Sequence, residues 1–267
     1  MGSSPRPASA GPVAPDEIAV ADAAGRIGDA LEGVFEAVAR TAADTETLLA
    51  PFVAAGRRPV SAELAALRPG LHARLAECEL VSGLGFVAAP GLLDDVPAWL
   101  EWWQTAVDGS VHPLLLDLDP ERSPYSDYTH WEWYTLPRDT GQRAVAGPYV
   151  DYLCSDEYSL TLSAPVTAGG RFLGVTAADV YLRRFEAVVT PLLQRLPEPA
   201  RLVNARGRVA ASTDPRHLVG SLTKDPVFAT ALDGRTTHVE HGGLRLRPCD
   251  GVPLVLVTAA PTASRRE

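Results

Sequence analysis

The feature that most constrains the fold is a long stretch near the N-terminus with helical spacing and no turn signal. From Asp16 to about Phe52, apolar or small residues recur at alternating intervals of four and three, at Val20, Ala24, Ile27, Leu31, Val34 and Val38, then through Thr41 and Thr45 to Leu48. This spacing predicts one long helix with a single apolar seam. The seam requires a cover. A second copy in a homodimer is one candidate, but the many alanines and the single Phe35 beside the seam make packing within the chain equally plausible.

Composition limits what such a chain can do. The 267 residues are 46% hydrophobic and 21% charged, as expected for a globular chain with one large or two small domains. The net charge of −9 argues against nucleic acid as a partner, because phosphate binding needs a basic surface. The cysteines, Cys78, Cys154 and Cys249, are three and widely separated, so they indicate neither a disulfide framework nor a zinc site. A reducing compartment fits best.

Nothing in the sequence predicts a membrane segment. No stretch reaches about 18 consecutive apolar residues, and residues 1–15 lack the apolar core of a signal peptide. We therefore expect a cytoplasmic protein that does not contact a membrane. The expected organisation is a disordered tail, a long helix, a larger module that includes a connecting helix, a smaller module and a short tail, at 1–15, 16–56, 57–198, 199–262 and 263–267.

Several elements of the larger module can be predicted locally. Helical spacing follows Ser61, a candidate N-cap, with a kink expected at Pro69. The segment 80–89 reads as a strand that ends at a Pro-Gly turn. We expect Trp99, Trp102 and Trp103 to share a short helix, and residues 114–119 to form a strand.

The second half of the chain has clearer patterns. Leucine alternates with serine and threonine over 158–163, which is typical of a half-buried strand, and Gly169-Gly170 predicts a hairpin to a partner strand at 172–180. A helix is expected from Leu182 until Pro197. The smaller module is expected to contain strands at 200–204, 208–212 and 253–259 and a helical stretch at 226–232. The fold class is therefore α+β.

No enzyme signature is present. The sequence lacks a dinucleotide fingerprint in a strand-turn-helix context, a phosphate-binding loop and a nucleophile elbow. His238 and His241 are three residues apart but lack nearby carboxylates in a helical context, so they indicate solvated strand and turn rather than a metal site. We expect no catalytic residues, no metal and no cofactor.

One region does indicate chemistry. The candidate set combines aromatic residues with two carboxylates: Trp131, Trp133, Tyr134, Tyr149, Asp151 and Asp179. If the segment 128–151 is extended, residues two apart share a face. Aromatic faces attract a cation, and carboxylates add charge-assisted hydrogen bonds to ammonium protons. The set therefore suits an amine, although tryptophan and tyrosine on strands are more often core residues.

The order of several phrases resembles a known family. GPYVD at 147–151, SLTLSAPV at 159–166, GRFLGVTAADV at 170–180 and VNARGRVAASTDPRHLVG at 203–220 are similar to the double Cache sensor family. The resemblance covers about residues 16–260. It implies a long N-terminal helix followed by two PAS-like modules with antiparallel sheets, with the ligand in the first module.

The resemblance also implies which residues bind. A subset of the family that recognises amino acids carries Arg-x-Trp-Tyr, then Tyr-x-Asp, then a later Asp. Trp133 and Tyr134, Tyr149 and Asp151, and Asp179 match these elements, but Trp131 stands where the arginine is expected. An indole cannot replace the bidentate pair of an arginine with a carboxylate. The resemblance therefore implies a sensor of a small amine that lacks an α-carboxylate.

Alternatives stay open at this point. Arg138 or Arg143 could replace the missing arginine, so that the ligand is an amino acid after all. The module could instead be degenerate, with its own tryptophans filling the site, and act as a scaffold through the long helix. Because family members usually carry membrane helices and output modules, this chain resembles a free-standing sensor that signals through an unknown partner protein.

Overall fold

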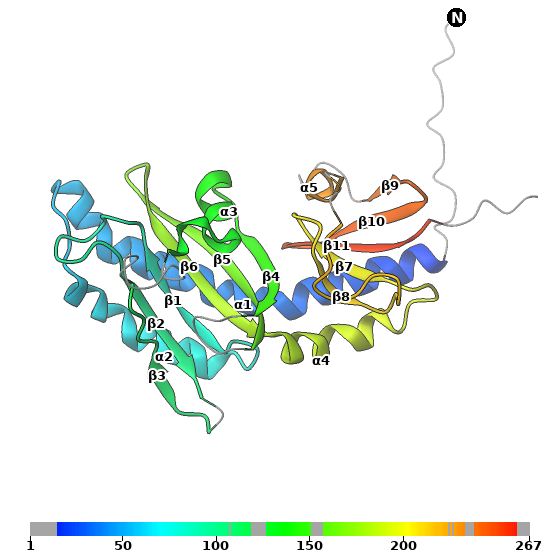
Figure 1. Cartoon of the computed structure of the whole chain (residues 1–267), viewed down its shortest axis with the longest axis horizontal. Coiled ribbons are helices and arrows are strands. Elements are labelled where there is room, and N and C mark those ends of the chain that lie inside the picture. The colour runs from blue at the N-terminus through cyan, green and yellow to red at the C-terminus, as the bar shows by residue number, and fades with distance from the viewer. Residues whose placement is uncertain are drawn as a thin grey trace, which may run out of the picture.

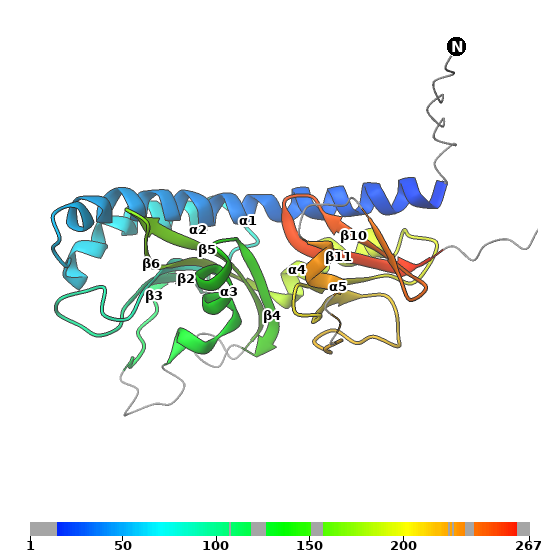
Figure 2. The same ribbon diagram turned by 90° about the horizontal axis from the view of Figure 1, so that it is seen from above.

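One long helix supports two antiparallel sheets. The computed structural model describes residues 15–106, 108–118, 127–150, 157–223, 225, 227–232 and 238–260. Helix α1 (Pro15–Ala54) has 40 residues and runs along the whole molecule, with the larger sheet beside its C-terminal half and the smaller sheet beside its N-terminal half (Figures 1 and 2). This arrangement confirms the predicted α+β class and the long N-terminal helix. Among the described residues, none of the helices combines the length and apolar character that a membrane span requires.

The larger sheet has six strands in the order β3-β2-β1-β6-β5-β4, and all neighbours are antiparallel. The strands are β1 (Gly83–Ala88), β2 (Leu100–Thr105), β3 (Val111–Pro113), β4 (Ala144–Val150), β5 (Tyr158–Ala168) and β6 (Arg171–Tyr181). Its helices are η1 (Ser61–Leu67), α2 (Arg68–Glu77), η3 (Tyr128–His130), α3 (Glu132–Thr140) and α4 (Leu182–Leu193), which leads to the smaller sheet. Figure 2 shows α1 and α3 on opposite faces of this sheet.

The smaller sheet repeats this topology with five strands in the order β8-β7-β11-β10-β9. Its elements are β7 (Arg201–Asn204), β8 (Val209–Ser212), α5 (Val227–Ala231), β9 (Val239–His241), β10 (Leu244–Cys249) and β11 (Val252–Ala259). The five strands β2-β1-β6-β5-β4 of the larger sheet correspond in order to β8-β7-β11-β10-β9 of the smaller sheet. In both, one face contacts α1 and the other is turned away from it.

The helix seam is used inside the chain. The seam residues from Val20 to Val38 are at most 4% exposed and belong to one core cluster with residues of both sheets and of α4. Towards the end of the helix the burial shifts by one residue, because Leu49 is buried and Leu48 only half-buried. The packing expected within the chain is therefore the one observed. Because the seam residues from Val20 to Val38 are buried within the chain, they are not free to contact a second copy.

Some local predictions are wrong. Trp102 and Trp103 lie on strand β2, not on a helix, because the strand pairs on both sides with β1 and β3. Residues 114–118 have no regular structure, and the short strand β3 precedes them. Ser61 is not an N-cap: Val60 holds that position, and Ser61 Oγ donates to Asp95 instead (2.7 Å). The kink expected at Pro69 is confirmed, since η1 ends there and α2 begins.

At Gly28, α1 lies close against the backbone of the smaller module. A Cβ placed on Gly28 would lie 2.4 Å from the carbonyl oxygen of Asp250, whereas a Cβ on the exposed Gly33 would meet nothing within 4 Å. We expect Gly28→Ala to force the helix away from the β10-β11 turn and to lower the free energy of unfolding by about 1–3 kcal/mol. Gly33→Ala, the matched control, should raise it by about 0.5–1 kcal/mol, because alanine favours helix. Urea unfolding of both variants measures the difference, and equal effects would contradict this view of the contact.

Candidate functional site

The candidate site lies on the face of the larger sheet that is turned away from α1. In the sheet, Thr161 of β5 pairs with Asp179 of β6, and Asp179 pairs with Gly83 of β1. Asp179 shares its face with Val175 and Ala177, which belong to a core cluster distinct from that of α1. The carboxylate is therefore presented on the far side of the sheet from the long helix.

Two glycines of β1, Gly83 and Gly85, leave space on the outer face of the sheet, which forms the floor of the site. A Cβ on Gly83 would lie 2.9 Å from Nε1 of Trp102, and a Cβ on Gly85 would lie 2.8 Å from the same indole ring. The absence of side chains on β1 thus lets Trp102 lie against the strand beside Asp179. Trp102 is 5% exposed, and its Nε1 is buried without a hydrogen-bond partner in the described part of the chain. This N–H is a donor that a ligand or water would satisfy.

The polar side of strand β5 is buried. Ser159, Thr161 and Ser163 are 0%, 2% and 0% exposed, and the hydroxyls of Ser159 and Ser163 have no partner among the residues that the structure describes. The alternation in this strand predicted a polar face in solvent. The strand is found as predicted, but α3 covers that face, so the burial prediction is wrong. Buried hydroxyls on a sheet floor are polar groups that a bound molecule could contact.

A hydroxyl relay holds the carboxylate. Thr161 Oγ1 donates to Asp179 Oδ1 (2.6 Å), and Thr161 Oγ1 is also hydrogen-bonded to the phenol of Tyr149. Because the single hydroxyl proton of Thr161 goes to the carboxylate, Tyr149 is the donor in the second bond. Asp179 is 8% exposed. The two hydrogen bonds thus fix the orientation of the Asp179 carboxylate and connect it to the ring of Tyr149.

Aromatic rings form the wall above this floor. Trp131 is the N-cap of α3, Trp133 and Tyr134 lie on its first turn, and Tyr149 lies on β4. The ring centroids of Trp131 and Tyr149 are 5.8 Å apart, and those of Trp133 and Tyr134 are 6.1 Å apart. The expectation of an extended segment is wrong here, since α3 turns the chain; the rings nevertheless belong to one cluster with Tyr128, Trp102 and Phe172.

Burial strengthens the preference of two phenols for the neutral form. It raises the pKa of Tyr134 to about 12 and the pKa of Tyr128 even further above its usual value. Tyr128 donates its hydroxyl to the carbonyl of Ala88 (2.8 Å), which fixes η3 on the sheet. At neutral pH the wall therefore carries no negative charge of its own, and the charge that this face offers to a ligand comes from carboxylates.

Five of the six residues expected from the sequence can be placed. Trp131, Trp133, Tyr134 and Tyr149 share one cluster, and Asp179 joins it through Thr161. Asp151 lies outside the described residues. Trp102, Ser159, Thr161 and Ser163 were not expected at the site. The only sequence signal for the last three was the alternation in β5, and the position of Trp102 required the pairing of β2 with the glycines of β1.

The two arginines considered as substitutes differ in position. Arg143 pairs with Glu32 of α1 (3.1 Å) and stacks on Phe35, so it is engaged on the helix side of the sheet. Arg138 lies 5.9 Å from the ring of Tyr134 and pairs with its neighbour Asp139 (2.7 Å). Arg143 is therefore not placed to bind a ligand carboxylate at the candidate site, whereas Arg138 lies beside the aromatic wall, at Tyr134.

Comparison with known proteins agrees with the fold. Residues 115–187 match the model of the first PDC sensor domain of methyl-accepting chemotaxis protein-like proteins, and this segment includes all six expected site residues. The structure is similar to that of a methyl-accepting chemotaxis protein X, with 16% identity, a TM-score of 0.61, and coverage of 92% of this chain and 96% of that chain.

Two chemoreceptor domains of Pseudomonas aeruginosa are also similar. The ligand-binding domain of PctC in complex with GABA has 21% identity and a TM-score of 0.51, covering 90% of this chain and 97% of that chain. That of PctB in complex with L-Arg has 16% identity and a TM-score of 0.51, covering 94% and 95%. The chain thus has the fold of the two-module, Cache-type ligand-binding domains of chemoreceptors.

The relay through Thr161 makes a testable contribution to stability. Thr161→Val keeps the shape of the side chain but removes the hydroxyl between Tyr149 and Asp179. We expect the free energy of unfolding to fall by about 1–3 kcal/mol, because buried polar groups lose a partner. Thr167→Val, at an exposed position of the same strand, should change it by less than about 0.5 kcal/mol. Urea unfolding provides the measurement; similar values for the two variants would show that the relay does not stabilise the fold.

Proposed function

We propose that this chain is a ligand-binding sensor domain whose larger module binds a small amine, as an ammonium or quaternary ammonium ion. The proposal depends most on one observation: the buried carboxylate of Asp179 is linked to Tyr149 of the aromatic wall through a single hydroxyl, that of Thr161. In this proposal Asp179, together with Asp151, carries the countercharge, and Trp131, Trp133, Tyr134 and Tyr149 surround the cation. The fold and the matched family model support a binding protein rather than an enzyme.

The physical argument rests on charge and burial. Because water screens a buried carboxylate only weakly, its attraction for a cation bound beside it is stronger than at an exposed site. Aromatic faces attract a cation by about 0.5–2 kcal/mol, more when water is excluded. A charge-assisted hydrogen bond contributes about 1.5–3 kcal/mol. The two effects act on the same group of a ligand, its ammonium, so an amine uses both.

The position of Trp131 separates this site from an amino-acid site. The resemblance expects an arginine there, which would hold the ligand carboxylate, and Arg143 is engaged with Glu32 instead. Trp131 also has a buried Nε1 without a partner among the described residues. An indole N–H can donate one hydrogen bond to a neutral acceptor but cannot balance a carboxylate. We infer that the ligand has the ammonium group of an amino acid and lacks its acid group.

Pairs of ligands that differ only in the carboxylate test this directly. Isobutylamine is L-valine without the carboxylate, agmatine is L-arginine without it, and propylamine is GABA without it. We expect at least one amine to bind more tightly than its acid partner in calorimetric titration, and Asp179→Asn to weaken that binding about 10–100-fold. Choline extends the series to a quaternary ammonium ion. Thermal unfolding of each variant without ligand controls for loss of the fold.

Two results would contradict the amine proposal. Binding of the acids without their amines would favour the amino-acid alternative, for which the contact of Arg138 with Tyr134 is the supporting observation. No heat and no stabilisation with any amine or amino acid would favour the scaffold alternative, in which the site is filled by side chains such as Trp102. The downstream partner and the cytoplasmic location stay predictions from the sequence.

Restoring the arginine should change the ligand class. In Trp131→Arg the guanidinium would stand at the N-terminus of α3, where it can pair with a ligand carboxylate. We expect this variant to improve the affinity for L-valine relative to isobutylamine by about tenfold or more. Trp131→Leu is the control, since it removes the ring without adding a charge. An equal change in both variants would show that this position does not select for the carboxylate.

A further inference from the structure

The smaller module carries a buried charge on the face that corresponds to the candidate site. Strand β7 corresponds to β1 of the larger sheet, and Arg201 pairs with Val257 of β11. Val257 belongs, with Val203 and Val255, to a cluster distinct from that of α1. Arg201 therefore lies on the face turned away from the long helix, as Asp179 does in the larger module. Its charge is opposite to that of Asp179.

The guanidinium of Arg201 is buried without hydrogen bonds. Arg201 is 4% exposed, and none of its guanidinium N–H groups donates to a residue in the described ranges; Nε is fully buried. Among the described residues, its one ion pair is to Asp214, with Nη1 3.8 Å from Oδ2, which is too long for a hydrogen bond. Burial accordingly lowers the pKa of Arg201 from its ordinary value, and Asp214 opposes that shift. A buried guanidinium normally has its donors satisfied, so the buried Nε–H of Arg201 lacks an acceptor in the described part of the chain.

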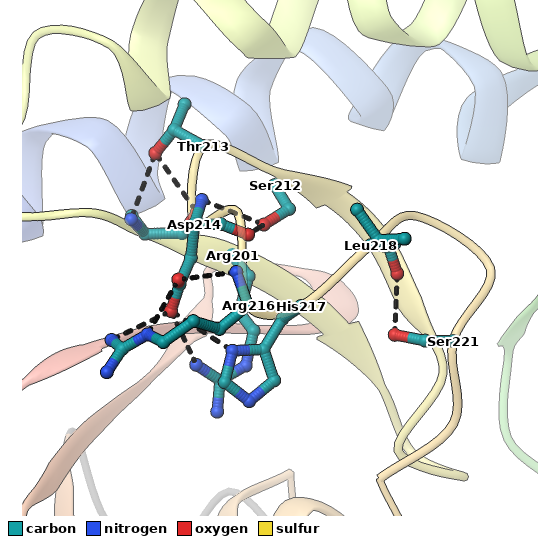
Figure 3. A network of polar contacts seen from close by, with 9 residues as sticks. Arg201, Ser212, Thr213, Asp214, Arg216, His217, Leu218 and Ser221 are labelled. Atoms are coloured by element: carbon teal, nitrogen blue, oxygen red, sulfur yellow. Dashed lines mark hydrogen bonds and ion pairs between the residues drawn. The ribbon is translucent and has the colours of Figure 1, made fainter.

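Asp214 cannot supply these acceptors because other residues occupy it. Its Oδ1 accepts from the backbone N–H and Nε of Arg216, each at 3.0 Å, and its Oδ2 contacts Nη2 of Arg216 (3.2 Å) and Nδ1 of His217 (3.0 Å). Figure 3 shows the side chains of Arg201, Arg216 and His217 converging on this one carboxylate. Arg216 thus holds Asp214 in an orientation that leaves Arg201 without a hydrogen bond to this carboxylate.

The charge balance favours a negative ligand. The guanidinium groups of Arg201 and Arg216 and the imidazole of His217 surround the single carboxylate of Asp214. The net charge of this cluster is therefore at least +1. Water could satisfy the donors but not the charge. The geometry points to a second site in the smaller module, which binds a small anion between Arg201 and Arg216. A carboxylate matches best, because its two oxygens fit the fork of N–H groups on a guanidinium.

The side chain of Arg216 suits the entrance of this site. It is 77% exposed, whereas those of Arg201 and Asp214 are 5% and 3% exposed. His217, 31% exposed, stands between solvent and the buried carboxylate. In this proposal a small anion approaches along the exposed Arg216 towards the buried Arg201. Acetate is the simplest probe of this size and charge.

NMR of the arginine Nε–Hε groups tests the proposal on the full chain. The Arg201 signal is assigned by its loss in Arg201→Met, or in Arg201→Lys where the methionine variant does not fold. Sodium acetate, sodium phosphate and sodium chloride are then titrated separately. We expect a saturable shift of the Arg201 signal with acetate, while the signals of exposed arginines report any general effect of salt.

Two variants distinguish a site from a salt effect. Arg216→Ala removes a positive charge and frees Asp214 to turn towards Arg201, so the Kd for acetate should rise about tenfold or more. Arg195→Ala removes one exposed positive charge elsewhere and should leave the Kd unchanged. Saturation with phosphate or chloride alone supports an anion site and overturns its preference for a carboxylate. No shift with any anion, a drift shared by exposed arginines, or an unchanged Kd in Arg216→Ala overturns the site itself.

Discussion

The packing of α1 along both sheets is the interaction on which the rest of the structure depends. One apolar seam contacts the larger sheet, the smaller sheet and α4, so the two modules share a core without sharing a sheet. The helix also contacts the strand that carries Asp179: Thr176 Oγ1 of β6 donates to the carbonyl of Val38 (3.3 Å), on the opposite face of the sheet. Strand β6 and α1 are thus in direct contact, and α1 in turn contacts the smaller module.

The sequence predicts the parts of the fold whose pattern is long and regular. The seam of α1 and the β5-β6 hairpin each repeat one period several times. The helix was located to within about two residues and the hairpin at its predicted turn, although β5 extends five residues beyond the predicted stretch, to Ala168. Short elements with mixed signals were not. Helix α3 has nine residues with Pro137 among them, and β2 has six residues with two adjacent tryptophans. Local preference is weak in such segments, so tertiary packing decides their conformation.

The candidate site shows a different limit of sequence reasoning. The aromatic residues and Asp179 were identified because a resemblance supplied their order, not because their spacing defines a surface. Thr161 was not identified, since alternation in a strand shows that two faces differ but not what covers the polar one. Trp102 was missed because its position depends on the pairing of β2 with Gly83 and Gly85. Both residues are defined by contacts between strands distant in sequence.

The two modules use one topology to present opposite charges. In the larger module the strand β1 carries glycines on the outer face, which leaves room for an indole and lets the charge come from the neighbouring strand. In the smaller module the corresponding strand β7 itself carries the charge, on Arg201, and its neighbour β11 contributes valines. The two charges lie on neighbouring strands of the shared topology, both on the outer face. In the two proposals above, selectivity for cations or anions therefore resides in a few side chains on the outer face of each sheet. Because α1 covers only the inner faces, such side chains can change the ligand class while the core that joins the modules is preserved.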